Sequence, residues 1–125
     1  MGGYWIVKTV NGGQIAHYVV HQDVWGWGET VKLVTPDGFG LVSMSFSNGS
    51  PGVCYISGLS VVPEVRRQGI ATNLMRACEN YCKQRGIFRI DLNSRKEGWL
   101  IDFYGSLGYA QLFEEDGEMK MYKML

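Results

Sequence analysis

Hydrophobic and polar residues alternate through much of the first half of the chain, a pattern typical of half-buried β-strands. Short clusters of Gly, Asn, Asp and Pro interrupt the alternation and indicate tight turns. The pattern predicts five strands in an antiparallel meander, at residues 4–10, 14–20, 31–35, 39–46 and 53–62. Residues 22–30, in which Trp25 and Trp27 stand among glycines, are expected to form a loop.

The hydrophobic pattern changes to a helical period after Gly69. Apolar residues recur every three or four positions over residues 70–85, and Gly86 is expected to end this helix in a left-handed conformation. A strand at 87–92 then closes a right-handed parallel crossover, which places it beside the strand at 55–62. Residues 99–107 are predicted as a short helix stopped by Gly108, and residues 109–113 and 118–125 as a closing hairpin.

Length and charge restrict the class of protein. A chain of 125 residues is expected to form a single domain over residues 1–125. Twelve Lys and Arg balance twelve Asp and Glu, which argues against a nucleic-acid partner. No apolar run approaches the roughly 18 residues that cross a bilayer, so no membrane partner is expected. The sequence leaves a homodimer open.

The cysteines and histidines form no disulfide or metal pattern. Cys54, Cys78 and Cys82 are odd in number, and the last two lie one helical turn apart on an apolar face. This favours buried free thiols in a reducing compartment, so we expect a cytoplasmic protein. His17 and His21 lie in the distant strand region without a Cys-x-x-Cys motif, so no metal cofactor is expected.

The junction between the fifth predicted strand and the long predicted helix is the strongest candidate for a binding site. Its sequence is Arg66-Arg67-Gln68-Gly69-Ile70-Ala71. Small residues leave several backbone N–H groups uncovered there, and the helix N-terminus adds partial positive charge. The segment is therefore expected to bind a pyrophosphate group.

Two segments resemble motifs of the GNAT N-acetyltransferase superfamily. Residues 61–71, Val-Val-Pro-Glu-Val-Arg-Arg-Gln-Gly-Ile-Ala, followed by Leu74, resemble its acyl-CoA motif, and residues 103–109, Phe-Tyr-Gly-Ser-Leu-Gly-Tyr, are similar to its second motif. The resemblance covers residues 53–125. It implies an α/β (α+β) fold: a mixed, mostly antiparallel sheet with a central parallel strand pair that splays into a V, flanked by helices. The N-terminal helices of the family are expected to be reduced, because residues 22–30 replace them.

The resemblance implies acetyl-CoA as the acyl donor. Backbone amides at the helix start would hold its pyrophosphate, and the preceding strand would offer an edge to the pantetheine arm, with Gly58 at the bulge that starts the splay. Tyr104 matches the family tyrosine that gives a proton to the departing thiolate. The donor-binding residues expected on this basis are Leu59, Ser60, Val61, Arg66, Arg67, Gln68, Gly69, Ile70, Ala71, Thr72 and Tyr104.

The implied function is transfer of an acetyl or acyl group to a primary amine of a small molecule, peptide or protein, by direct attack in a ternary complex. No general base is assigned, because the strand at 53–62 has no carboxylate. Water relayed through Ser57 or Ser60, or an amine that arrives deprotonated, would replace it. Trp25 or Trp27 is a candidate for the acceptor pocket.

Two other functions fit parts of the sequence. A catalytically silent GNAT-like module that binds CoA or a protein partner would account for the missing base and the reduced N-terminal helices. A dinucleotide-binding unit would use Asp91, which follows the glycine turn near the end of a strand. Only one of the three glycines of that motif is present, and the first half of the chain predicts hairpins instead.

Overall fold

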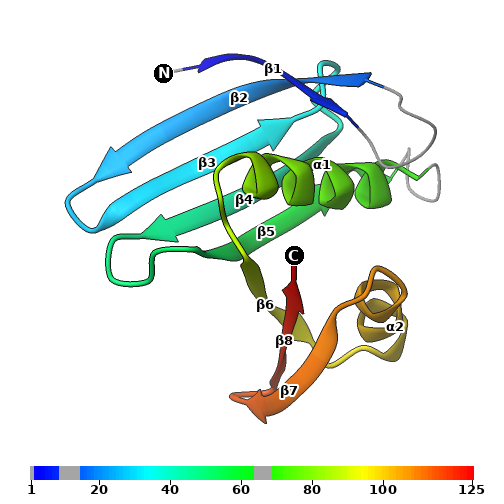
Figure 1. Ribbon diagram of the computed structural model, residues 1–125. Helices are drawn as coiled ribbons and strands as arrows, with labels where there is room; N and C mark the ends of the chain where they lie inside the picture. Colours follow the sequence, from blue (N-terminus) through cyan, green and yellow to red (C-terminus); the bar gives the residue numbers. More distant parts are fainter. Residues whose placement is uncertain (1, 9–14, 64–68) are drawn as a thin grey trace.

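The computed structural model describes residues 2–8, 15–63 and 69–125. These residues form one sheet of eight strands and two α-helices (Figure 1). In chain order the elements are β1 (Gly2–Lys8), β2 (Ile15–Trp25), β3 (Gly28–Val34), β4 (Gly40–Ser47), β5 (Val53–Val61), α1 (Ile70–Gln84), β6 (Arg89–Arg95), α2 (Gly98–Ser106), β7 (Ala110–Glu115) and β8 (Glu118–Met124). The strands lie side by side in the order β1-β2-β3-β4-β5-β6-β8-β7.

Within the described ranges, neighbouring strands run antiparallel except for β5 and β6, which run parallel. Helix α1 connects these two strands, and Gly86 follows it with a φ of +81°. The meander, the parallel crossover, the short helix and the closing hairpin predicted from the sequence are therefore confirmed. The result is a mixed, mostly antiparallel sheet with one parallel pair inside it, as the resemblance implies.

The prediction of a loop at residues 22–30 is wrong. β2 continues to Trp25 and β3 begins at Gly28, so residues 21–25 pair with residues 28–32 across a tight turn. Gly28 lets β3 lie close to β4, because a Cβ atom there would come within 2.0 Å of the carbonyl oxygen of Phe46. The Trp and Gly content favours a loop locally, but pairing with the neighbouring strands decides the structure. No helix precedes α1 in the described residues.

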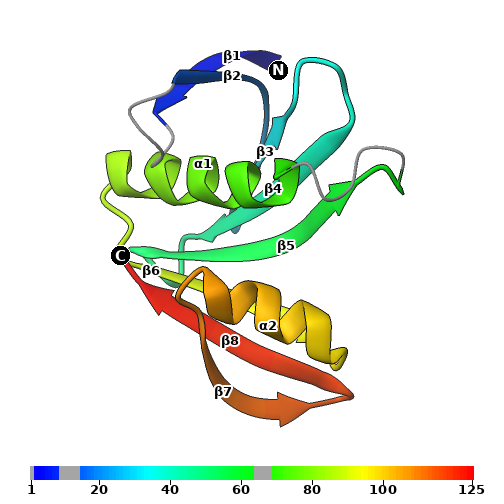
Figure 2. The same cartoon turned by 90° about the vertical axis from the view of Figure 1, so that its right-hand side faces the viewer.

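Both helices lie on the same face of the sheet (Figure 2). Alternate residues of the strands point to this face, where the apolar stripe of α1 covers them. The largest fully buried side chains are Leu33, Met44, Leu74, Met75, Ile90, Leu92, Met121, Val31, Val42, Cys54 and Cys78. Cys54, Cys78 and Cys82 are buried free thiols, as predicted. β1 and β2 arch over the outer side of α1 (Figure 2), which encloses the helix within the curve of the sheet.

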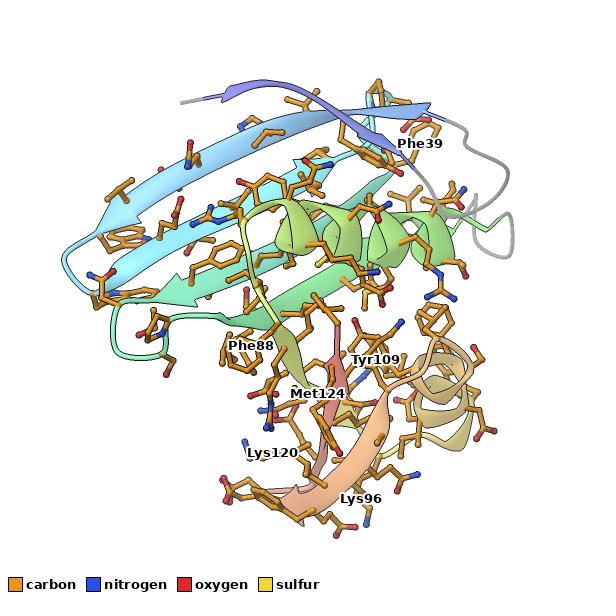
Figure 3. All side chains as sticks on the ribbon, viewed as in Figure 1. Phe39, Phe88, Lys96, Tyr109, Lys120 and Met124 are labelled. Atoms are coloured by element: carbon orange, nitrogen blue, oxygen red, sulfur yellow. The ribbon has the colours of Figure 1, made fainter. Side chains whose placement is uncertain are left out.

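A buried ionic cluster holds α1 against the C-terminal part of the sheet. Glu79 on α1 is only 4% exposed. Its Oε1 lies 3.1 Å from Nζ of Lys123 and 3.2 Å from Nη1 of Arg76, and its Oε2 accepts a hydrogen bond of 3.1 Å from the hydroxyl of Tyr109. Lys123 also donates to the carbonyl of Leu107 at 2.8 Å. This Glu79 cluster fixes α1, the end of α2 and β8 relative to one another, with Tyr109 between α1 and the C-terminal strands (Figure 3).

A second ion pair joins the end of α1 to β3. Arg85 donates a hydrogen bond to Glu29, and its guanidinium carbon lies 4.0 Å from the ring centroid of Phe46. The hydrogen bond from Arg85 lowers the pKa of the Glu29 carboxyl below its usual value of 4.5. The unfolded chain therefore takes up this proton at a higher pH than the folded protein. The pair stabilises the fold above the unfolded pKa and loses that effect as the pH falls through the folded pKa.

We expect Glu29→Gln to flatten the dependence of stability on pH as the pH falls below the usual carboxyl pKa of 4.5. Urea unfolding at a series of pH values should show a steeper loss of unfolding free energy on acidification in the wild type than in the variant. Glu114→Gln is the control, because it removes an exposed carboxylate that pairs with Lys96 at 2.9 Å and contributes little. Equal slopes for the wild type and Glu29→Gln would contradict the prediction.

Candidate active site

β5 and β6 separate part of the way along their length. Their pairing ends at Ile56 and Leu92, although β5 continues to Val61 and β6 to Arg95. In the described residues, no strand lies beside this edge of β5 beyond Ile56. The backbone groups of residues 57–60 that face the gap are therefore accessible to a ligand.

A β-bulge on β5 accompanies the separation. Ser43 of β4 pairs with Gly58 and Met44 pairs with Ile56, so Ser57 is an extra residue between them. A bulge bends its strand and increases the local twist, which turns the outer half of β5 away from β6. The bulge predicted at Gly58 is confirmed, with Ser57 as the inserted residue.

The first turn of α1 presents uncapped amides. Gly69 precedes the helix with a φ of +80°, a left-handed conformation that glycine adopts readily, and no side chain caps the helix. A bond from Asn73 N–H to the Gly69 carbonyl, 2.9 Å long, closes the first turn, so the amides of Ile70, Ala71 and Thr72 have no acceptor within the helix. A Cβ atom on Gly69 would meet no described atom within 4 Å. The helix start therefore directs donors and partial positive charge at space that no described residue fills.

Gly40 determines how closely the start of α1 lies on the sheet. A Cβ atom there would come within 2.9 Å of side-chain carbons of both Ile70 and Leu74. Gly40 also pairs with Val61, the last residue of β5. The close contact at this glycine therefore places the first turn of α1 beside the outer end of β5.

These elements enclose a cleft of about 1130 Å³. Its lining residues are Tyr55, Ile56, Ser57, Gly58, Leu59, Ser60, Val61, Gly69, Ile70, Ala71, Thr72, Leu92, Asn93, Arg95, Trp99, Leu100, Phe103, Tyr104 and Glu118. Successive strand residues point to opposite faces, so buried Leu92 points to the helices and Asn93 points away from them. Residues from both faces of the sheet therefore line the cleft, which lies at the gap between the two separated strands.

Tyr104 contacts the cleft from α2. Its side chain is only 7% exposed, and its ring centroid lies 5.2 Å from that of Phe103 and 6.1 Å from that of Tyr109. Burial raises the pKa of the phenol above its usual value of 10, although the charge of Arg95 opposes this shift. Its hydroxyl makes no hydrogen bond to the described residues. The phenol is therefore protonated at neutral pH and available as a proton donor.

Most of the sequence-predicted donor-binding residues meet in this cleft. Those that line it are Leu59, Ser60, Val61, Gly69, Ile70, Ala71, Thr72 and Tyr104. Arg66, Arg67 and Gln68 lie outside the described residues. Ser57 also lines the cleft, and its hydroxyl lies 3.0 Å from that of Ser43.

Trp25 and Trp27 lie away from the cleft, contrary to the hypothesis that one of them contributes to the acceptor pocket. Neither Trp25 nor Trp27 lines the cleft, although both are about half exposed. Trp25 borders a separate hollow of about 410 Å³ together with Val53, the first residue of β5. The β2–β3 hairpin places Trp25 near the start of β5, whereas the cleft lies along its outer half. Trp99, at the beginning of α2, lines the cleft instead.

Sequence reasoning missed the residues that line the cleft on the face away from the helices. They are Tyr55, Asn93, Arg95 and Glu118. The register of the sheet would have identified Glu118 as a residue of the cleft. Arg95 of β6 pairs directly with Glu118 of β8, and directly paired residues of antiparallel strands point to the same face.

We find neither a metal centre nor a membrane-spanning helix in the part of the chain that the structure describes. Its His, Cys, Asp and Glu side chains form no group of three or more that could hold a metal ion. Neither α1 nor α2 is long and apolar enough to cross a membrane.

Known proteins resemble this chain in sequence pattern and in fold. The family model described as "Acetyltransferase (GNAT) family" matches residues 35–109. The PaiA N-acetyltransferase from Thermoplasma acidophilum, solved in complex with coenzyme A, has 16% identity and a TM-score of 0.67 over 77% of this chain and 60% of that chain. An acetyltransferase from Bacillus cereus has 26% identity and a TM-score of 0.66 over 77% and 73% of the two chains. The ribosomal-protein-S18-alanine N-acetyltransferase from Escherichia coli has 17% identity and a TM-score of 0.65 over 80% and 70%.

The matched region extends from the residues just before β4 to those just after α2. It therefore includes the separated strands, the helix start and Tyr104. The aligned part spans about 60% of the length of the Thermoplasma protein. Because the family model covers more than half of the sequence and the solved structures share the fold, this chain belongs to the GNAT family of acetyltransferases.

Proposed function

We propose that this protein transfers an acetyl group from acetyl-CoA to a primary amine by direct attack in a ternary complex. The observation that supports this most strongly is the uncapped start of α1, which opens into a cleft that passes between β5 and β6. Membership of an acetyltransferase family supports it, as does the coenzyme A complex of a protein of the same fold.

The cleft residues fit the parts of acetyl-CoA. The amides of residues 70–72 would bind the diphosphate, because Gly69 leaves the space beside them open. The free edge of β5 at Leu59 and Ser60 would pair with the two amides of the pantetheine arm. Leu100 and Phe103 line the same cleft from α2 and would pack against the arm.

Bound acetyl-CoA would supply a thioester as the acyl donor. As the amine attacks, a nitrogen–carbon bond forms, the carbon–sulfur bond breaks, and negative charge passes from the carbonyl oxygen to the sulfur. A backbone N–H at residues 59–61 would donate to that oxygen, and the phenol of Tyr104 would give its proton to the sulfur. The attacking nitrogen would lose its own proton to water beside Ser57 or Ser60.

The acceptor would enter from the face of the sheet that the two helices leave open. There the cleft is lined by Tyr55, Asn93, Arg95 and Glu118. Donor and acceptor would then approach the gap from opposite faces and bind together, as direct attack requires. An amine of a small molecule, a peptide or a protein fits such an opening.

We expect Tyr104→Phe to lower kcat about tenfold and to leave the affinity for acetyl-CoA unchanged. The effect is smaller than the roughly hundredfold of many catalytic acids, because a thiolate, whose conjugate thiol has an ordinary pKa of about 8.5, leaves with little assistance. Stopped assays of CoA release with a panel of amines would measure it. Tyr18→Phe, which changes a buried tyrosine outside the cleft, should keep wild-type activity. If Tyr104→Phe kept full activity at every pH, Tyr104 would not be the proton donor to the sulfur.

A catalytically silent CoA-binding module is the second candidate. The observation that favours it is the absence of a carboxylate from β5, the strand whose edge would hold the donor. Acetyl-CoA would then raise the melting temperature, and no amine of a broad panel would be acetylated. Turnover of any amine in that panel would exclude this candidate.

A further inference from the structure

We propose that Glu118 selects acceptor amines that carry a second positive charge. This inference rests on the proposed acetyltransferase function and assigns a substrate class to it. Glu118 is the first residue of β8 and lines the cleft from the face away from the helices. Of the described residues that line the cleft, it is the one with a carboxylate.

The register of the sheet gives the distance from Glu118 to the gap. Glu118 pairs with Arg95, and Met121 pairs with Leu92, where β5 and β6 separate. Three residues of strand correspond to about 10 Å. A group bound by Glu118 would therefore lie well away from the point where β5 and β6 separate. One atom of the acceptor could not contact Glu118 and occupy the gap between the strands at the same time.

In the part of the chain that the structure describes, the charges around Glu118 leave its carboxylate without a partner. Nearby cations pair with carboxylates outside the cleft: Arg95 with Glu97 at 3.6 Å, and Lys120 with Glu115 at 3.8 Å. Lys120 also donates to Asn93 at 3.3 Å. The carboxylate of Glu118 makes no ion pair or hydrogen bond with any described residue, although the Glu118 backbone pairs with Arg95. Among the described residues that line the cleft, Glu118 therefore carries a negative charge that its cross-strand neighbour Arg95 does not neutralise by direct contact.

Such a charge recognises a cation rather than a neutral group. A diamine of suitable length places its reacting nitrogen at the gap and its second ammonium group at Glu118. A monoamine of the same length buries an alkyl end beside an unpaired carboxylate, which loses hydration without gaining a partner. The acceptor class that fits is an amine with a second cationic group several bonds away from the reacting nitrogen.

The test uses two matched pairs of amines, diaminobutane with butylamine and diaminohexane with hexylamine. Calorimetry first measures binding of CoA to the wild type, Glu118→Gln, Glu118→Asp and Glu114→Gln. Each amine is then titrated into the CoA-bound proteins, and acetyl transfer from acetyl-CoA is measured with the same amines. Glu114→Gln is the matched control, because Glu114 lies on β7 outside the cleft and pairs with Lys96.

We expect the wild type to bind at least one diamine about tenfold more tightly than its monoamine partner, as one charge-assisted contact provides. Glu118→Gln should remove this preference by raising the Kd and KM of the diamine more than those of the monoamine. Glu118→Asp and Glu114→Gln should keep it. The proposal would be overturned if the wild type showed no preference for a diamine or if Glu118→Gln kept that preference. It would also be overturned if none of the four amines bound the CoA-bound protein. Failure of CoA itself to bind would instead overturn the acetyltransferase function.

Discussion

Gly69→Ala is expected to weaken acetyl-CoA binding about a hundredfold while the protein remains folded. The methyl group would stand in the open space beside the amides of residues 70–72, where the diphosphate is proposed to bind. Loss of two hydrogen bonds to a charged group, at about 1.5 kcal/mol each, corresponds to a factor of this size. Calorimetric titration of each purified protein with acetyl-CoA measures it.

Gly86→Ala is the matched control for this experiment. Gly86 has a φ of +81°, close to the +80° of Gly69, and a Cβ atom on it would likewise meet no described atom within 4 Å. Both substitutions force an L-residue into a left-handed conformation, which costs about 1–2 kcal/mol of stability. We expect the two variants to lose similar amounts of stability. Only Gly69→Ala is expected to lose affinity for acetyl-CoA. Equal affinities of the two variants for acetyl-CoA would contradict the assignment of the helix start.

Glu79→Ala is expected to lower the free energy of unfolding by about 3 kcal/mol. The substitution leaves the ammonium of Lys123 and the guanidinium of Arg76 without their shared carboxylate, at positions where those side chains are 22% and 25% exposed. It also removes the acceptor of the Tyr109 hydroxyl. Urea unfolding of the wild type and the variant would measure the loss.

Two further variants separate the charge from the shape of Glu79. Glu79→Gln keeps an acceptor for Tyr109 and should cost less than Glu79→Ala. Lys123→Met combined with Glu79→Ala should cost less than the sum of the single changes, because the two groups interact directly at 3.1 Å. A loss below about 1 kcal/mol in Glu79→Ala would show that the cluster does not hold α1 in place.

The elements of the second half could be predicted because their signals are local. The helical period over α1 and the left-handed glycine Gly86 depend on residues close together in the sequence. The same holds for the helix start, where Gly69 and the small residues after it indicate an anion site before any tertiary contact is known. These signals also indicate which residues meet in the cleft.

Other features could not be predicted because they depend on strand register. The hairpin at residues 22–30 forms through pairing with β3 and β4, which the Trp and Gly content of that segment conceals. Glu118 lies at the cleft because it pairs with Arg95. Glu79 interrupts the apolar face of α1, and its burial becomes understandable only when Lys123 and Tyr109 are placed beside it.

The proposed acetyl transfer requires above all that the start of α1 binds the diphosphate of acetyl-CoA. Calorimetric titration of the unmodified protein with acetyl-CoA, and separately with pantetheine, which lacks the diphosphate, tests it directly. We predict saturable one-to-one binding of acetyl-CoA and binding of pantetheine that is at least about a hundredfold weaker. No binding of acetyl-CoA, or equal affinity for the two compounds, would contradict the account.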